Sequence, residues 1–142
     1  GALYTWAAAM NGAVSNNDNP ITVQGACPSG WHLPSASEWE ELGDFLVSEG
    51  HSGVENAALK ATYGWNENGN GNDLYGFSAL PGGVRTSSNS VFYSEGSYSY
   101  WWISTESSSD RGDYYGVSYL PTFWFTNNAP KSDGLSIRCV RD

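Results

Sequence analysis

The sequence predicts a single α+β domain over residues 1–142, with two short helices, long loops and a mainly antiparallel, twisted sheet. Helical patterns lie in the first half of the chain, and short aromatic or β-branched runs separated by turn residues fill the second half. At 142 residues, the chain is long enough to bury a hydrophobic core without metal ions or many disulfides.

The first apolar segment, Leu3–Met10, ends at Asn11 and Gly12, a pair that is typical of turns. Its apolar residues fit a short helix and a short strand equally well, so both structures stay open. Residues 11–26 are rich in Asn and Gly and predict an exposed loop with a brief strand-like interval at 21–23.

The clearest helix signal is a capping box, in which Ser35 occupies the N-cap position and Glu38 follows three residues later. We expect this helix to end near Gly50, and a second helix to span residues 54–61. The apolar residues that recur at helical spacing in the first helix, and predict one buried face, are Trp39, Leu42, Phe45 and Leu46.

The second half of the chain consists of short runs rich in aromatic and β-branched residues, divided by Gly, Ser, Asn and Pro. Such runs are typical of strands. The predicted strands are 77–80, 91–93, 100–104, 114–120, 123–126 and 135–140. Trp101 and Trp102 are adjacent within one of them, so their side chains are expected to face opposite sides of the sheet.

The chain contains two cysteines, Cys27 and Cys139, which lie near opposite ends of the sequence. Their separation excludes a compact Cys-x-x-Cys metal or redox motif, because those motifs need short spacing. A long-range disulfide would stabilise the fold by about 4–5 kcal/mol if it acts through chain entropy. Two separate buried thiols in a reducing compartment are the alternative.

The charge balance limits the classes of partner. The chain has 15 acidic and 6 basic residues, for a formal net charge of −9. Nucleic acid and anionic membrane surfaces are therefore disfavoured as partners. No apolar run approaches the ~20 residues that span a bilayer, so direct membrane insertion is not expected. We expect any export signal to have been removed or to lie outside this sequence.

Four motifs, in this order along the chain, resemble the Fibrobacter succinogenes major paralogous domain, a family found widely in Bacteroidetes surface proteins. The motifs are Trp31–Ser35 with the acidic and aromatic helix after it, Tyr75–Gly83, Tyr100–Glu106 and Arg138–Arg141. The resemblance implies a C-type lectin-like fold, akin to that of formylglycine-generating enzymes, in which a terminal cysteine strand closes against the region before the first helix. It also implies an N-terminal edge strand that this sequence is expected to lack.

The resemblance carries a further expectation about variability. C-type lectin-like domains with this ending are recurrent targets of diversity-generating retroelements, which randomise adenines in asparagine codons. Randomising the first two codon positions excludes Lys, Glu, Gln, Met and Trp, and between Ser107 and Phe125 only Trp124 belongs to the excluded set. The region between Glu106 and Gly134 is commonly rich in asparagine in relatives, whereas here Ser, Asp, Tyr, Gly, Phe and Trp replace much of it.

The segment before the second cysteine combines flat aromatic rings with small hydrogen-bonding side chains, as antibody loops do. We expect it to form the ligand-binding surface, although alternating aromatics also fit the buried face of strands. The predicted ligand-binding residues are Ser107, Ser108, Asp110, Arg111, Asp113, Tyr114, Tyr115, Tyr119, Phe123, Trp124, Phe125 and Asn127.

No cofactor is expected, and calcium has only a weak candidate site at Glu106, Asp110 and Asp113. The oxidase chemistry of formylglycine-generating enzymes depends on an active-site cysteine pair. Here both cysteines are expected to be joined to each other. Enzymatic activity is therefore not expected.

These observations together predict an extracellular ligand-binding module, diversified by a retroelement, at a cell surface or on a phage particle. Its partner would be a protein or a glycan on a cell surface. The alternatives are a fixed carbohydrate-binding or adhesion domain of a fibre-degrading bacterium, and a structural surface repeat without a ligand. The sequence does not indicate an oligomeric state.

Overall fold

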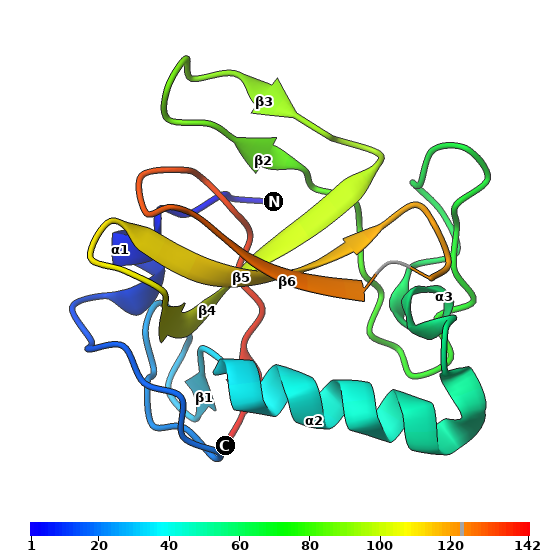
Figure 1. Ribbon diagram of the computed structural model, residues 1–142, viewed down its shortest axis with the longest axis horizontal. Coiled ribbons are helices and arrows are strands. Elements are labelled where there is room, and N and C mark those ends of the chain that lie inside the picture. Colours follow the sequence, from blue (N-terminus) through cyan, green and yellow to red (C-terminus); the bar gives the residue numbers. More distant parts are fainter. Residues whose placement is uncertain (123) are drawn as a thin grey trace.

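A three-stranded antiparallel sheet forms the middle of the structure (Figure 1). Its strands are β4 (Tyr98–Glu106), β5 (Arg111–Ser118) and β6 (Trp124–Pro130), with β5 in the centre. The computed structural model describes residues 1–122 and 124–142, and Trp124 through its backbone alone. Short helices beside mainly antiparallel strands confirm the α+β class that the sequence predicts.

The first helix, α1 (Trp6–Met10), settles the ambiguity of the N-terminal apolar segment in favour of a helix. Thr5 caps it, since its side-chain oxygen accepts a hydrogen bond from the backbone N–H of Ala8 at 3.3 Å. The helix ends at Asn11, whose left-handed backbone (φ 49°) cannot continue it.

The second helix, α2 (Ala36–Leu46), begins at the predicted capping box. Ser35 Oγ accepts from the Glu38 N–H at 3.2 Å, and a Glu38 carboxylate oxygen accepts from the Ser35 N–H at 3.0 Å. A π-helical turn, η1 (Val47–His51), continues the chain to the predicted end. One position of the expected apolar face differs, because Phe45 is 43% exposed.

The third helix, α3 (Glu55–Leu59), is followed by an Asn- and Gly-rich tract that packs tightly against it. The backbone N–H of Gly71 donates to the Ala61 carbonyl at 2.9 Å. A methyl group at Gly71 would overlap the Lys60 carbonyl oxygen, so only glycine fits this approach. The tract thus forms a wall of the fold and is not a free linker.

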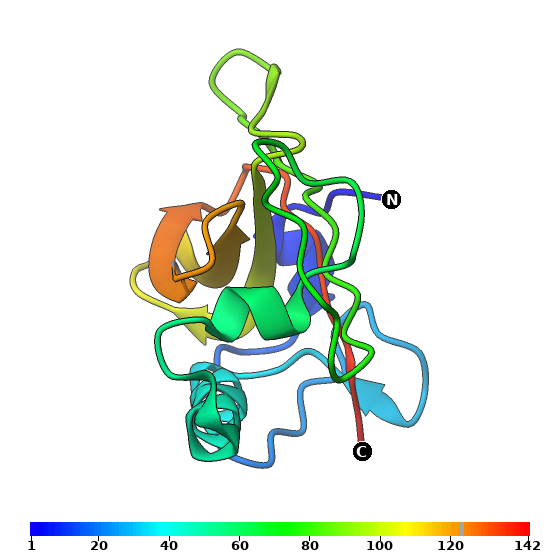
Figure 2. The same ribbon diagram turned by 90° about the vertical axis from the view of Figure 1, so that its right-hand side faces the viewer.

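Two small sheets flank the central one. In the first, β2 (Val84–Arg85) pairs with β3 (Phe92–Tyr93) in a hairpin that extends away from the body (Figure 2). In the second, β1 (Trp31–His32) pairs antiparallel with β7 (Val140–Arg141). This second pair brings the C-terminal segment beside the start of α2 (Figure 1).

The predicted disulfide is confirmed. Cys27 and Cys139 are bonded, although they lie 112 positions apart in sequence. His32 links the same two regions, because its ring nitrogens lie 2.8 Å from Asp142 Oδ1 and 3.0 Å from Glu38 Oε1. A covalent bond and a buried histidine therefore hold the last residues against the start of α2.

Two predicted strands are wrong for much of their length. Residues 77–80 form no strand, and only Ala79 makes a bridge, to Lys60. The positive φ of Ser78 (54°) breaks the extended backbone there. In 135–140, Leu135 pairs with one partner segment and Ser136 with another, so no continuous ladder forms before Val140.

Other boundaries shift along the chain. β5 begins at Arg111, earlier than the predicted 114, and β6 extends to Pro130, beyond the predicted 126. The helix predicted at 54–61 is shorter in the structure, where α3 spans Glu55–Leu59. Pairing between strands sets these ends, since β5 and β6 remain in register from Arg111 opposite Pro130 to Val117 opposite Trp124.

The two faces of the central sheet bury separate cores, as the adjacent tryptophans of β4 predict. Trp102 lies in the α1 core and Trp101 in the α2 core. The α1 core consists of Trp6, Ala9, Met10, Ile21, Val23, Cys27, Leu33, Trp102 and Leu135. The α2 core consists of Trp39, Trp65, Ala79, Trp101, Ile103, Tyr115 and Val117.

Candidate ligand-binding surface

The sheet face that covers the α1 core carries a group of partly exposed aromatic side chains beyond the part that α1 covers. We call this group the aromatic face; its members are Tyr98, Tyr100, Tyr114 and Phe125. Tyr119 meets the Tyr98 ring edge to face at 6.4 Å but packs against the α2 core. Strand register explains how it assembles. Tyr100 lies opposite Gly116, Gly116 lies opposite Phe125, and Tyr114 lies opposite Trp102, so their side chains share one side of the sheet.

The rings of the aromatic face contact one another in fixed orientations. Tyr98 and Tyr100 stack with centroids 5.7 Å apart and planes 3° apart. Tyr100 meets Tyr114 edge to face at 5.3 Å, and Phe125 meets both at 6.0 and 6.1 Å. Edge-to-face and stacked pairs of this kind are favourable arrangements for aromatic rings. The surface is thus pre-organised by its own contacts.

A glycine makes room for the central ring. A Cβ added at Gly116 would lie 2.5 Å from Phe125 Cζ, which means that the phenyl ring lies directly over the strand at this position. Any larger residue would lift the ring away from the sheet. Gly116 therefore keeps the aromatic face flat.

Burial raises the pKa of two phenols on this surface. It raises the pKa of Tyr100 to about 12, an effect that a hydrogen bond to Ser94 partly opposes. Burial also raises the pKa of Tyr114, while the nearby Arg111 charge lowers it. The hydroxyl groups of Tyr100 and Tyr114 are therefore uncharged at neutral pH, beside the apolar surface of the rings.

Asn127 lies beside the aromatic face, whereas Arg111 and Asp113 share their side of β5 with Tyr115. Asn127 is exposed and is paired in register with Tyr114. The Arg111 side chain reaches across the sheet, where Nε donates to Asn128 Oδ1 and Nη2 donates to the Asn128 carbonyl at 3.1 Å. Asp113, opposite Asn128, is half-buried. Of these predicted residues, Asn127 has the most open position.

The predicted residues Ser107, Ser108 and Asp110 lie in the turn between β4 and β5. Ser108 Oγ donates to an Asp110 carboxylate oxygen at 2.7 Å, and this bond is the main reason that the pKa of Asp110 is lowered. Lys131 clamps the same turn, since its Nζ donates to the Ser109 carbonyl at 3.1 Å. The turn is exposed but tied down.

The turn and Tyr119 lie beyond opposite ends of β5. An eight-residue strand at ~3.3 Å per residue separates its ends by roughly 23 Å. One small ligand could not contact both ends. The structure therefore divides the predicted surface into a polar turn and the aromatic face.

One predicted ligand residue belongs to the interior. Tyr115 is only 4% exposed and stacks on Trp39 in the α2 core, with centroids 5.3 Å apart and planes 10° apart. Its side chain is not available at the surface, because α2 covers that side of β5. Phe123 lies outside the described residues, and so does the side chain of Trp124.

The weak calcium candidates do not form a common site. Glu106 is paired with the Lys131 ammonium, and Asp110 is bonded to Ser108. In residues 1–122 and 124–142, no group of three or more His, Cys, Asp or Glu side chains is placed to hold a metal ion. Glu106, Asp110 and Asp113 thus do not converge on one point.

Sequence reasoning missed Tyr98 and Tyr100, which contribute two of the rings. Their signal is the spacing Tyr98, Tyr100, Trp102, which places three aromatic side chains on one face of a strand. Trp102, on the same face, is fully buried, so this spacing alone does not separate core residues from surface residues. Exposure rises along β4 away from α1, and this gradient separates the core residue from the surface residues.

Comparison with known proteins gives one result. Neither the curated proteins nor the solved structures contain a significant match. Within the described chain, no helix is long and apolar enough to cross a membrane. The family described as the Fibrobacter succinogenes major domain (Fib_succ_major) matches residues 1–141, and the chain therefore belongs to this family.

Proposed function

We propose that this domain is a non-catalytic ligand-binding module and that the aromatic face is its binding surface. The observation that carries the proposal is the cluster of four partly exposed rings on one side of a sheet whose other side is covered by α2. Rings with neutral hydroxyl groups supply contact area at little cost in side-chain entropy. Such a surface suits a protein epitope or the apolar face of a sugar ring.

The chemistry of the surface favours a neutral ligand. Tyr100 and Tyr114 stay protonated well above neutral pH, and Asn127 adds an uncharged amide at the border. The chain as a whole carries a net charge of −9, which repels polyanions. A protein or glycan on a cell surface fits these properties better than nucleic acid does.

An extracellular or cell-surface location, including a phage particle, is part of the proposal. Its support is the disulfide between Cys27 and Cys139, a bond that persists in oxidising compartments. The same bond occupies both cysteines, so neither thiol is free for cysteine-dependent oxidase chemistry. A C-type lectin-like chain path is also proposed, supported by the pairing of β1 with β7.

The proposal also includes diversification of this surface by a retroelement. If it occurs, packing limits it, because Val117 is fully buried and Tyr115 lies in the α2 core. Substitution should concentrate at Tyr114, Tyr119 and Asn127 and spare those two positions. A template repeat and a reverse transcriptase gene beside the coding sequence would establish the mechanism, and their absence would favour a fixed binding domain.

The binding test uses a glycan array together with binding to bacterial cells, measured for the natural protein and for Tyr114→Ala and Phe125→Ala. We expect both variants to lose most of the binding while remaining folded. Tyr63→Ala is the matched control, because Tyr63 is 64% exposed and belongs to no strand of the sheet. Equal loss with the control, or no binding in either assay, would favour the structural-repeat alternative.

A further inference from the structure

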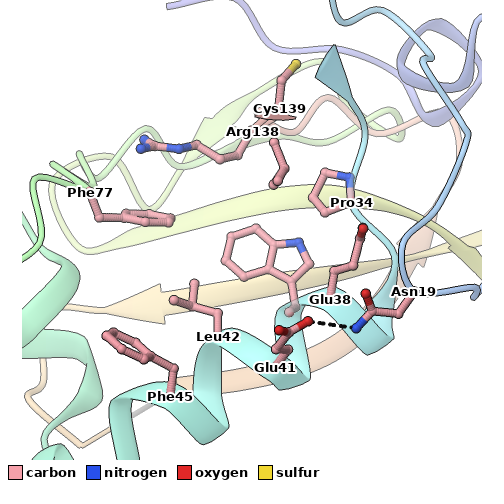
Figure 3. Close-up of a pocket in the computed structure, with 11 residues that line it drawn as sticks. Asn19, Pro34, Glu38, Glu41, Leu42, Phe45, Phe77, Arg138 and Cys139 are labelled. Carbon is pink, nitrogen blue, oxygen red and sulfur yellow. Dashed lines mark hydrogen bonds between the residues drawn. The ribbon is translucent and has the colours of Figure 1, made fainter. Parts of the chain in front are cut away.

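A groove lies between α2 and the C-terminal segment, on the side of the molecule that the aromatic face does not use. It encloses about 560 Å³, within the size range of small-molecule sites. Its walls are mostly apolar: Leu42 and Phe45 come from α2, and Phe77 comes from the loop after α3. Figure 3 shows these three side chains turned toward the same space as Arg138.

Arg138 supplies the positive charge of the groove. Its guanidinium lies over the Phe77 ring, with its central carbon 4.0 Å from the ring centroid (Figure 3). This cation–π contact occupies one face of the guanidinium, and among the described residues no group accepts a hydrogen bond from its N–H edges. The side chain is half-buried, and within the described residues no carboxylate lies at ion-pair distance from it.

The nearest acidic influence on Arg138 comes from Asp73, whose carboxylate is already engaged. Ser78 donates to it from the backbone N–H and from Oγ, each at 2.6 Å. Burial lowers the pKa of Arg138, and Asp73 offsets this only in part. A partly desolvated cation therefore faces an apolar space without a dedicated counter-ion. In such a setting, a ligand carboxylate forms its strongest charge-assisted hydrogen bonds.

The polar groups at the far end of the groove limit the choice of ligand. Glu41 accepts a hydrogen bond from Asn19 Nδ2 at 2.8 Å (Figure 3). Glu38 is held by His32 and by the backbone N–H of Ser35. Few donors or acceptors remain for the many hydroxyl groups of a sugar. The apolar walls and the single cation instead match a molecule with one anionic group next to a flat apolar body.

We propose that this groove binds a small aromatic monocarboxylate, with the carboxylate on the Arg138 guanidinium and the ring against Leu42, Phe45 and Phe77. The fork of guanidinium N–H groups would hold the carboxylate in a bidentate pair. The volume argues for a small molecule and against an extended chain. This site is independent of the proposed function of the aromatic face.

The test titrates 3-phenylpropionate into ¹⁵N-labelled protein and follows the amide signals of residues 42, 77 and 138 by NMR. We expect roughly millimolar affinity, as is usual for so small a ligand. The neutral analogue 3-phenylpropan-1-ol should bind about tenfold more weakly, because it cannot form the charged pair. The amine 3-phenylpropylamine should not bind. Equal binding of the alcohol, tighter binding of the amine, or no binding of the acid would overturn the proposal.

Variants separate the role of the charge from that of the fold. Arg138→Met should weaken binding of the acid about tenfold and leave binding of the alcohol unchanged. Arg141→Met is the matched control, since Arg141 is exposed in β7 and does not line the groove. If Arg138→Met does not fold, Arg138→Lys keeps the charge without the planar fork and should give an intermediate loss. Equal weakening by Arg141→Met would contradict the assignment.

Two other occupants are outcomes of the same experiment. The peptide Gly-Gly-Phe carries a carboxylate beside a phenyl group, and tighter binding of this peptide than of 3-phenylpropionate would make the groove a site for a chain end. A second copy of the domain would show as concentration-dependent dimerisation in sedimentation, abolished by Phe45→Ser. Either result would overturn the small-molecule proposal.

Discussion

The two faces of the central sheet use the same three strands and yet differ in how completely they are covered. On the α2 side, Trp39 stacks on both Trp101 and Tyr115, and these rings are 3–5% exposed. On the α1 side, coverage ends near Trp102, and the rings beyond it stay partly exposed. Neighbouring residues of one strand can therefore serve stability and recognition separately.

The largest expected effect follows from opening the covered face. Trp39→Ala should lower the free energy of unfolding by about 3–5 kcal/mol, because it removes a buried indole from two ring stacks and leaves a cavity. Denaturant unfolding followed by circular dichroism measures this change. A loss below about 1 kcal/mol would show that the α2 side is not the more tightly packed face.

The second effect concerns Lys60, which is buried beneath the residues that follow β5. Its Nζ donates to the carbonyls of Ser118, Tyr119 and Leu120 at 2.8 to 3.3 Å. Burial lowers the pKa of Lys60 to about 8, whereas the ordinary value is 10.5. Between these two values, the unfolded chain holds a proton that the folded protein has released.

Stability should therefore rise as the pH increases from about 8 toward about 10, and the lowering of the Lys60 pKa from 10.5 to about 8 would account for at most about 3.4 kcal/mol. Above pH 10 the trend should reverse, because burial also raises the pKa of Tyr100 and Tyr115 to about 12 and the unfolded chain then loses those protons first. Urea unfolding at a series of pH values measures both limbs. Lys60→Met should abolish the rise, and a rise that persists in this variant would contradict the assignment.

The third effect compares two glycines of β5 on the same face. A methyl group at Gly112 would overlap the indole of Trp6, which is buried and donates to the Ile103 carbonyl at 3.0 Å. Gly112→Ala should therefore cost about 1–3 kcal/mol. Gly116→Ala meets Phe125, a partly exposed ring that can rotate away, and should cost less than about 1 kcal/mol while weakening ligand binding. Thermal unfolding of the pair tests the order; equal costs would mean that Phe125 is as tightly held as Trp6.

A small effect on stability, close to that of Gly116→Ala, is expected from Phe125→Ala. Because this ring is only partly covered, its removal should cost about 1 kcal/mol, much less than the loss of Trp39. Its expected cost in binding is much greater. A loss of stability comparable with that of Trp39→Ala would assign Phe125 to the scaffold and would remove it from the proposed surface.

Local sequence signals predicted the elements that depend on local interactions. Ser35 and Glu38 cap α2 as expected, and the adjacent Trp101 and Trp102 face opposite cores as the geometry of a strand requires. The single cysteine pair is bonded. In each case the interaction involves residues close in sequence, or the chain offers no other partner.

Features that depend on distant partners could not be predicted. Whether Tyr114 or Tyr115 faces the surface depends on which side of the sheet α2 covers, and period-two spacing does not contain this information. The prediction of a strand at 77–80 was wrong because this segment pairs through a single bridge, between Ala79 and Lys60. The groove at Arg138 needs Phe77, a residue about sixty positions earlier, and no local pattern joins them.

The position of Trp101 and Trp102 has a consequence for how the domain unfolds. One peptide bond joins a residue of each core, so β4 cannot leave one core without pulling on the other. The two hydrophobic clusters should therefore melt together, in a single transition with equal calorimetric and van't Hoff enthalpies. A ligand that binds the aromatic face would then raise the melting temperature of the whole domain in one step.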